Sequence, residues 1–481
     1  MSDVLARLRE LQSADLPVHG GRTLAYVYDS GLAEVDRVGR EAVAAYAGSN
    51  GLDPTAFPSL LQMENGVVGF AADLLDAPAS AVGTITSGGT ESVLLAVQSA
   101  RDSRPDVATP NIVVPTTVHA AFHKAAHYFG VEIRQVPVGA DFRADPAAMA
   151  AATDDSTVLV VVSAPSYAHG VVDPVEAIAS DAAARGIRCH VDACIGGWVL
   201  PYAARLGRPV PPWTFAVEGV TSISVDLHKY GYAPKGTSVL LHRTPAHRRP
   251  QFFASASWPG YTMLNSTMQS TKSGGPLAGA WAVLETLGDE GYLRLSRDVF
   301  EAVDRIVAGI AAPLRVVVPP DSTLVALATD DSCDPFTICD EMAARGWYVQ
   351  PQMSYDGHPA TVHLSVSAAT LASVDEFLTA LGESVAAAVA AGPVAVDPGV
   401  AAFIASLDPA TLSDDDFDGL LATSGLVGES DSGSLELPGR MAEVNAMLDL
   451  ASPAMREALL VAFLDRLSRP VRGAAGGPAE R

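Results

Sequence analysis

Short apolar runs alternate with segments of helical type from residue 82 to residue 192. The strand-like runs are 82–86, 112–114, 131–138, 158–163 and 187–192. Such alternation predicts a sheet of mostly parallel strands joined by right-handed crossovers. The run VLVVVS at 158–163 is apolar enough for a strand that is covered on both faces. We therefore predict an α/β fold whose ligands bind beyond the carboxyl ends of the strands.

The glycine-rich stretch SGGTES at 87–92 follows the first of these strands and opens a helix. Free backbone N–H groups and the positive end of a helix dipole attract anions, and Gly89 lets the chain approach a ligand closely. Thr90 adds a hydroxyl donor. The stretch lacks the patterns of a P-loop and of a dinucleotide turn. It predicts either a phosphate-binding turn or a simple helix cap.

The segment 221–237, TSISVDLHKYGYAPKGT, reads as a strand that ends in a short loop carrying two lysines, Lys229 and Lys235. His228 flanks the first lysine, and glycine and proline fix the loop. Lys229 is thus a candidate amine for attack on a carbonyl group. Ser163 and Asp192 end neighbouring strands, so we expect both at the same edge of the sheet.

An amine, a phosphate-binding turn and a carboxylate at neighbouring strand ends are the parts that a pyridoxal phosphate site requires. Lys229 would hold the coenzyme as an imine, and Gly89 and Thr90 would bind its phosphate. Asp192 would keep the pyridine nitrogen protonated, because a nearby negative charge raises that nitrogen's pKa. His119 would stack on the ring. We therefore predict pyridoxal 5'-phosphate as the cofactor.

The composition limits which classes of binding partner and which cellular compartment we expect for this protein. The 481 residues carry a net charge of −24, which argues against nucleic acid as a partner. The four cysteines, Cys189, Cys194, Cys333 and Cys339, fit neither a zinc ribbon nor a disulfide framework. No signal peptide or membrane-spanning stretch is evident. We expect a soluble cytoplasmic protein.

Three histidines, His119, His123 and His127, recur at helical spacing, but the glutamate of an HExxH metal motif is replaced by Ala120. No metal site is predicted. Along the chain, we predict an N-terminal helix and arm (1–60), a large coenzyme domain (61–300), a small α/β domain (301–392) and a C-terminal helical extension with a disordered tail (393–481). The acidic run 414–418 is expected to be a linker or a solvated cap.

Several strings closely resemble the sphingosine-1-phosphate lyase family, with few gaps from about Leu16 to Leu381. They include SGGTES (87–92), HGVVDP (169–174), HVDACIGGW (190–198) and DLHKYGYAPKG (226–236). The resemblance implies the aspartate-aminotransferase fold (fold type I) and retro-aldol cleavage of a phosphorylated sphingoid base to a long-chain aldehyde and phosphoethanolamine. It also implies a homodimer whose active sites are shared.

By position, the resemblance makes Lys229, Tyr28, His119 and Lys235 catalytic. Tyr28 and Lys235 would also contact the substrate, and Gly274 and Gly275 would reach the coenzyme phosphate of the other subunit. Two positions depart from the family. Asp53 stands where the family has a histidine for the substrate phosphate, and Lys272 stands in a stretch where the family more often has an arginine and a proline.

The sequence is also compatible with other functions. A decarboxylase or lyase that acts on a non-phosphorylated amine would share the fold and the lysine, and Asp53 would suit a cationic group. An aminotransferase would need an arginine for the α-carboxylate, and the strand 362–366 offers none. A coenzyme-binding protein without activity is disfavoured by the intact lysine and aspartate.

Overall fold

The computed structural model describes residues 2–423 and 439–468. The chain divides into two compact units. The first is built from Met1–Ile310, Val316–Ala326 and His363–Phe377, and the second from Ala311–Arg315, Leu327–Val362 and Leu378–Arg481. The predicted domain boundaries at residues 60, 300 and 392 stay predictions. The predicted disordered tail after Arg469 lies outside the described residues.

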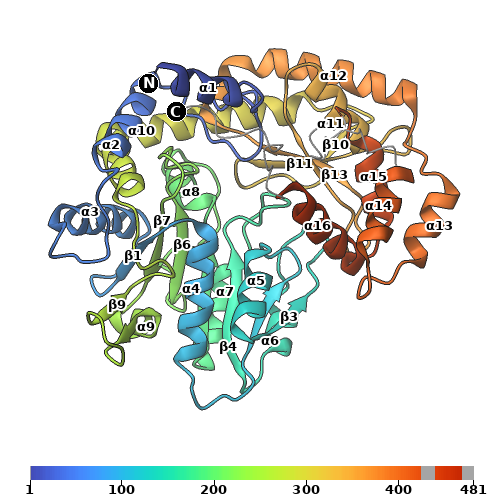
Figure 1. Cartoon of the computed structure of the whole chain (residues 1–481). Coiled ribbons are helices and arrows are strands. Elements are labelled where there is room, and N and C mark those ends of the chain that lie inside the picture. The colour runs from blue at the N-terminus through green and yellow to red at the C-terminus, as the bar shows by residue number, and fades with distance from the viewer. Residues whose placement is uncertain (1, 424–438, 469–481) are drawn as a thin grey trace, which may run out of the picture. The chain divides into compact units, whose positions relative to one another are not determined.

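A seven-stranded sheet forms the centre of the first unit, in the order β1-β7-β6-β5-β4-β2-β3 (Figure 1). Its strands are β1 (Val82–Thr86), β2 (Asn111–Pro115), β3 (Glu132–Val136), β4 (Thr157–Ser163), β5 (Arg188–Asp192), β6 (Ser222–Asp226) and β7 (Ser238–His242). Only β7 runs antiparallel to its neighbours, β6 and β1. The predicted mostly parallel sheet is confirmed.

Helices between the strands bury their apolar sides against this sheet. They are α4 (Gly89–Asp102), α5 (Ala121–Phe129), α6 (Pro146–Ala152), α7 (Val175–Ala184) and α8 (Leu200–Arg205). The fully buried side chains of Val97, Phe122 and Ile112 join α4, α5 and β2 in one hydrophobic cluster. The run 158–163, expected to be covered on both faces, is buried along the whole of β4. This packing fixes the strand ends from which the candidate site is built.

The N-terminal segment contains α1 (Ser2–Gln12), α2 (Ala33–Ala45) and α3 (Pro58–Leu74). Helix α2 falls in a stretch that the sequence predicted only as an arm rich in turns. It packs on α10 (Gly274–Gly309), the long yellow helix of Figure 1. Gly39 and Gly279 face this contact, and a side chain at Gly279 would overlap Val43 of α2. Close packing against α10 therefore stabilises a helix that the sequence analysis did not predict.

The remaining elements of the first unit are short. They are α9 (Pro245–Arg248) and the two-stranded ladder of β8 (Phe253–Ser255) with β9 (Met263–Asn265). A second sheet has the order β10-β11-β13-β12. Its strands are β10 (Arg315–Val316), β11 (Leu324–Ala328), β12 (Gln350–Gln352) and β13 (Thr361–Ser365). Helix α11 (Pro335–Ala344) lies between β11 and β12 in the chain, and α12 (Val374–Ala391) follows β13.

The C-terminal region is helical, with α13 (Pro398–Ser406), α14 (Asp414–Thr423), α15 (Ala442–Leu450) and α16 (Pro453–Leu467). Ile404, Phe417 and Met455 join three of these helices in a core of their own. The acidic run 414–418, expected to be a linker or a solvated cap, lies in α14, and its first residues form the N-terminal turn of that helix. Asp414, Asp415 and Asp416 occupy the first turn of α14, where the helix dipole favours negative charge, and Ser413 exchanges hydrogen bonds with Asp416. No helix in the described ranges combines the length and the apolar character that a membrane crossing requires.

Candidate active site

The loop 227–237 carries both lysines and is closed at each end by the β6–β7 ladder. Asp226, the last residue of β6, pairs with Ser238, the first residue of β7. Inside the loop, a side chain at Gly231 would collide with the backbone of Leu227. The Tyr230 hydroxyl donates a 2.7 Å hydrogen bond to the carbonyl of Val366. The loop is therefore held tightly, and Lys229 has a defined position.

Lys229 forms a buried ion pair with Asp226, a residue that the sequence did not single out. The Lys229 Nζ lies 2.9 Å from Asp226 Oδ2, and only 2% of the Asp226 side chain is exposed. Burial alone would lower the pKa of Lys229, but the charge of Asp226 outweighs it and raises that pKa. Burial would raise the pKa of Asp226, but the charge of Lys229 holds it below its usual value. The cavity thus contains a complete charge pair.

The turn at 87–90 lies beside this pair. A Cβ atom at Gly89 would stand 2.8 Å from both Asp226 Oδ2 and Cys194 Sγ, so only glycine fits. Glu91 organises the turn, since its carboxylate accepts hydrogen bonds from the backbone nitrogens of Ser87 (2.6 Å) and Met268 (2.9 Å). Residues of the first turn of α4 line the cavity. The N-terminus of a helix is a favourable binding position for an anion.

The ends of β4 and β5 supply the other polar groups. Ser163 pairs with Asp192 in the ladder. Asp192 is 8% exposed, and its carboxylate accepts a 3.1 Å hydrogen bond from the Cys194 backbone nitrogen. His119 precedes α5, and its Nδ1 accepts from the backbone nitrogen of Ala121 at 3.1 Å. Asp192 therefore has a fixed orientation toward any ligand in the cavity.

These residues line one cavity of about 350 Å³. Of the predicted site residues, the lining contains Gly89, Thr90, His119, Ser163, Asp192, His228 and Lys229. It also contains residues that the sequence did not indicate: Pro165, Tyr167, Cys194, Ile195 and Asp226. A larger depression of about 650 Å³, lined partly by Phe70 and Trp213, contains none of the predicted site residues.

The N-terminal arm brings Tyr28 to the lysine loop. The Lys235 Nζ lies 5.0 Å from the centre of the Tyr28 ring and donates a 2.8 Å hydrogen bond to the carbonyl of Tyr26. Burial raises the pKa of the Tyr28 hydroxyl, although the charge of Lys229 opposes this. Loss of surrounding water, and then the charge of Lys229, lower the pKa of Lys235 to about 8. Tyr28 is therefore a neutral phenol at neutral pH.

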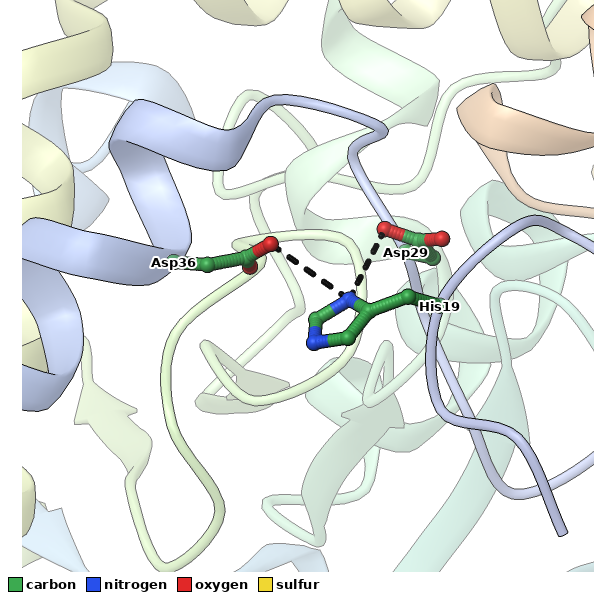
Figure 2. A group of neighbouring side chains, drawn as sticks. All are labelled: His19, Asp29 and Asp36. Atoms are coloured by element: carbon green, nitrogen blue, oxygen red, sulfur yellow. Dashed lines mark ion pairs between the residues drawn. The ribbon is translucent and has the colours of Figure 1, made fainter.

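A cluster of His19, Asp29 and Asp36 anchors this arm to α2 (Figure 2). The His19 Nδ1 lies 3.7 Å from Asp29 Oδ1 and 3.4 Å from Asp36 Oδ2. Asp29 also accepts hydrogen bonds from the backbone nitrogens of Gly20 and Gly31. The cluster therefore closes the loop that carries Tyr28.

Six predicted residues are absent from the cavity lining: Tyr28 and Lys235, described above, and Asp53, Lys272, Gly274 and Gly275. Asp53 is exposed, and its Oδ1 accepts hydrogen bonds from the backbone and hydroxyl of Thr55. The Lys272 Nζ is paired with Glu64 Oε2 at 3.1 Å and donates to the carbonyl of Ile85 at 3.0 Å. Gly274 and Gly275 begin α10 and pack closely against Ser49 and Val43 of the same chain.

The site fits pyridoxal phosphate on three structural grounds. A lysine points into a cavity beside a glycine at which no side chain could be accommodated. The first turn of α4 supplies backbone donors for a phosphate. The buried carboxylate of Asp192 lines the same cavity and can hold a protonated pyridine nitrogen.

Comparisons with known proteins support this assignment. A family model described as "Pyridoxal-dependent decarboxylase conserved domain" matches residues 29–328. A second, described as "Pyridoxal-dependent enzyme, C-terminal putative HTH domain", matches residues 398–466. The sphingosine-1-phosphate lyase of Arabidopsis thaliana is 39% identical over 72% of this chain and 64% of its own length. That of Dictyostelium discoideum is 36% identical over 74% of this chain and 67% of its own.

Solved structures agree with these matches. The structure of a sphingosine-1-phosphate lyase from Burkholderia pseudomallei has a TM-score of 0.76 and 32% identity, covering 81% of this chain and 91% of that one. A glutamate decarboxylase from Lactobacillus brevis, at 19% identity and a TM-score of 0.70, shares the fold over 80% of this chain and 92% of that one. The predicted fold type I architecture is confirmed. The chain belongs to the pyridoxal-dependent decarboxylase family, and its relatives there include the sphingosine-1-phosphate lyases.

Proposed function

We propose that this enzyme is a carbon–carbon lyase that cleaves a phosphorylated sphingoid base to a long-chain aldehyde and phosphoethanolamine. The observation that carries the proposal is the buried Lys229–Asp226 pair beside the glycine turn, in a chain whose similar proteins are named sphingosine-1-phosphate lyases. The chain spans 64–65% of the length of the two plant relatives that it matches. Activity and substrate are therefore proposals.

Lys229 would bind the coenzyme covalently through Nζ, the turn at 87–90 would bind its phosphate, and His119 would stack on its ring. When bound, the coenzyme supplies an electron sink for the bond that breaks at the amine-bearing carbon. Asp192 maintains that property, because its negative charge favours the protonated ring nitrogen. Ser163 and His228 complete the walls of the cavity.

The bond that breaks joins the amine-bearing carbon to the hydroxyl-bearing carbon. The hydroxyl loses its proton and becomes the aldehyde oxygen, and a proton is then added to the amine-bearing carbon. We assign the proton transfer to Lys229, whose Nζ lies in the cavity 2.9 Å from Asp226 Oδ2. Tyr28 would donate a hydrogen bond to the reacting oxygen, since its phenol is neutral at neutral pH. Lys235 would attract the substrate phosphate.

The direct test is to incubate the purified enzyme with dihydrosphingosine phosphate and to measure the long-chain aldehyde and phosphoethanolamine. We expect both products in equal amounts, and neither from Lys229→Ala. The same assay with unphosphorylated β-hydroxy amines tests the need for the phosphate. Release of carbon dioxide from an amino acid, with no aldehyde from any of these amines, would identify a decarboxylase and overturn the proposal.

A separate variant tests the role proposed for Asp53 in substrate binding. The carboxylate at this position repels a phosphate, whereas a histidine can carry a positive charge. We expect Asp53→His to lower the KM for the phosphorylated substrate and to leave that for unphosphorylated amines unchanged. Asp15→His, at another exposed carboxylate, is the control. No change in either KM would remove Asp53 from the phosphate site.

We propose further that the enzyme is a homodimer with shared active sites, located in the cytoplasm. Lys272, Gly274 and Gly275 are absent from the cavity lining of their own chain, which is consistent with a role in the partner's site. The four cysteines are free and buried, which suits a reducing compartment. Mixing Lys229→Ala with Lys272→Met subunits tests the sharing, because a mixed dimer would regain one intact site. No activity on mixing would contradict it.

A further inference from the structure

Three backbone N–H groups converge on the carboxylate of Glu91, a residue that is 6% exposed. Its Oε2 accepts a 2.6 Å hydrogen bond from the backbone nitrogen of Ser87. Its Oε1 accepts from the backbone nitrogens of Met268 at 2.9 Å and Gln269 at 3.3 Å. Glu91 also lines the coenzyme cavity. One side chain therefore joins the turn at 87–90 to a segment that is distant in the chain.

That distant segment, residues 266–269, is itself attached to the central sheet. The side-chain amide of Gln251 donates a 2.7 Å hydrogen bond to the carbonyl of Ser266. The other end of the same amide, Gln251 Oε1, lies 3.0 Å from Nε2 of His242, the last residue of β7. The segment therefore gives the turn a fixed attachment.

The turn also packs closely against the end of β6. A Cβ atom at Gly89 would stand 2.8 Å from Asp226 Oδ2 and from Cys194 Sγ. The turn is thus held by a packing contact at Gly89 and by the Glu91 hydrogen bond at Ser87. A change at Glu91 removes the second of these constraints and leaves the first in place.

The contacts of Glu91 require a hydrogen-bond acceptor at both side-chain oxygens. A carboxylate offers only acceptors, whereas the side-chain amide of glutamine has one oxygen and one NH₂ group. Glu91→Gln would therefore place an NH₂ group against either the N–H of Ser87 or those of Met268 and Gln269. A buried N–H group without an acceptor is unfavourable. The turn would consequently move away from the segment 266–269.

The charge of Glu91 has an effect of the opposite sign on coenzyme binding. A carboxylate in the wall of the cavity repels a phosphate group that binds at the first turn of α4. Loss of the charge alone would therefore strengthen the binding of the coenzyme. The direction of the change in affinity shows which of the two effects is larger.

We propose that Glu91 is a positioning residue for the coenzyme phosphate, which keeps the turn at 87–90 in its binding conformation before the coenzyme arrives. Hydrogen bonding outweighs repulsion, because three backbone donors depend on this one carboxylate. Without it, binding must first restore the turn, and this lowers the apparent affinity. The inference rests on the turn as the phosphate site and does not depend on the substrate.

The test is a fluorescence titration of the coenzyme-free protein with pyridoxal phosphate and, separately, with pyridoxal, which lacks the phosphate. We expect Glu91→Gln to raise the Kd for pyridoxal phosphate about tenfold or more, because a buried donor loses its acceptor. The Kd for pyridoxal should stay unchanged. Glu91→Asp keeps the charge but is one methylene too short to reach both segments, so it should also raise the Kd for pyridoxal phosphate. It serves alone if Glu91→Gln does not fold.

Asp340→Asn is the matched control. The Asp340 carboxylate also accepts hydrogen bonds from two backbone nitrogens, those of Met441 and Ala442, both at 2.9 Å, and it is absent from the cavity lining. This variant should lose stability in urea, as Glu91→Gln does, but keep the wild-type Kd for pyridoxal phosphate.

Two results would overturn the proposal. An unchanged or lower Kd for pyridoxal phosphate in Glu91→Gln would show that repulsion is at least as large as the hydrogen-bonding effect. An equal rise in the Kd for pyridoxal would place the effect outside the phosphate turn. Aldehyde release is not measured, so failure of the proposed lyase activity and failure of this inference are separate results.

Discussion

The ammonium group of Lys235 lies over the ring of Tyr28, 5.0 Å from its centre, and the two residues come from segments about two hundred positions apart. The cation is attracted to the electron-rich face of the ring. It also donates hydrogen bonds to the carbonyls of Tyr26 and His228. Lys235 therefore fastens the N-terminal arm to the loop that carries Lys229.

The charge of Lys235 should make substrate binding sensitive to alkaline pH. Its pKa is lowered to about 8, so the ammonium group is lost as the pH rises through that value. We expect the KM for a phosphorylated substrate to rise above pH 8, and the KM for an unphosphorylated analogue to stay level. Steady-state kinetics from pH 6.5 to 9.5, an interval of about 1.5 units on either side of that pKa, measures this. Lys235→Arg keeps its charge throughout, so a rise that persists in this variant would refute the assignment.

Coenzyme binding should depend on the absence of a side chain at Gly89. Gly89→Ala places a methyl group against Asp226 and Cys194, and we expect the Kd for pyridoxal phosphate to rise about tenfold or more, an effect of at least ~1.4 kcal/mol. Gly88→Ala is the matched control. Its Cβ would lie at an ordinary 3.5 Å from the nearest atom of His228, and its backbone is extended. Titration of the coenzyme by fluorescence distinguishes the two, and equal affinities would contradict the packing argument.

The Lys272–Glu64 ion pair should matter more to stability than a pair on the surface. Its side chains are 14% and 19% exposed, so Glu64→Gln leaves a largely buried ammonium group without its counter-ion. We expect a loss of about 2–4 kcal/mol in the free energy of unfolding. Glu41→Gln, which breaks an exposed pair with Arg37, should cost less than about 1 kcal/mol. Urea denaturation measures the free energy of unfolding of both variants. If the two variants lose similar amounts of stability, the burial of the Lys272–Glu64 pair does not determine its contribution.

Asp173 should make stability depend on mildly acidic pH. Burial raises the pKa of this carboxyl to about 6, although the backbone nitrogens of Ala144 and Ser163 donate hydrogen bonds to it. A raised pKa means that its stabilising contribution is complete below the unfolded-state pKa near 4 and is lost as the pH rises through 6. The stability advantage of the wild type over Asp173→Asn should therefore fall by up to about 3 kcal/mol between pH 4 and 7. A difference that does not change with pH would show that Asp173 titrates normally.

Strand ends were predictable, and contacts between distant segments were not. Ser163, Asp192 and Lys229 were identified because apolar runs of strand length end at or next to them, and parallel strands end at a common edge. Asp226 also ends a strand, but its importance comes from Lys229 three positions later, whose side chain turns back toward it. Glu91 lies in the first turn of α4, and only the fold brings residues 268 and 269 to its carboxylate.

Helix α2 and the acidic run of α14 also depend on contacts between segments that are distant in the sequence. Each is stabilised by a partner distant in sequence. For α2 that partner is α10. For α14 it includes Arg466 of α16, whose guanidinium group pairs with Asp418. Local composition therefore predicted only an arm where α2 forms, and a linker or a solvated cap where α14 begins.

The antiparallel pairing of β7 with β6 fixes the length of the loop 227–237. Because Asp226 and Ser238 are partners in the ladder, eleven intervening residues must span from one strand to the other. Inserting or deleting one residue here would either force the strands to slip, which turns every side chain of β7 to the opposite face, or displace the lysine from its acid. Other surface loops of such a scaffold can vary in length during evolution. In the loop 227–237, substitutions are compatible with the fold, whereas insertions and deletions are not.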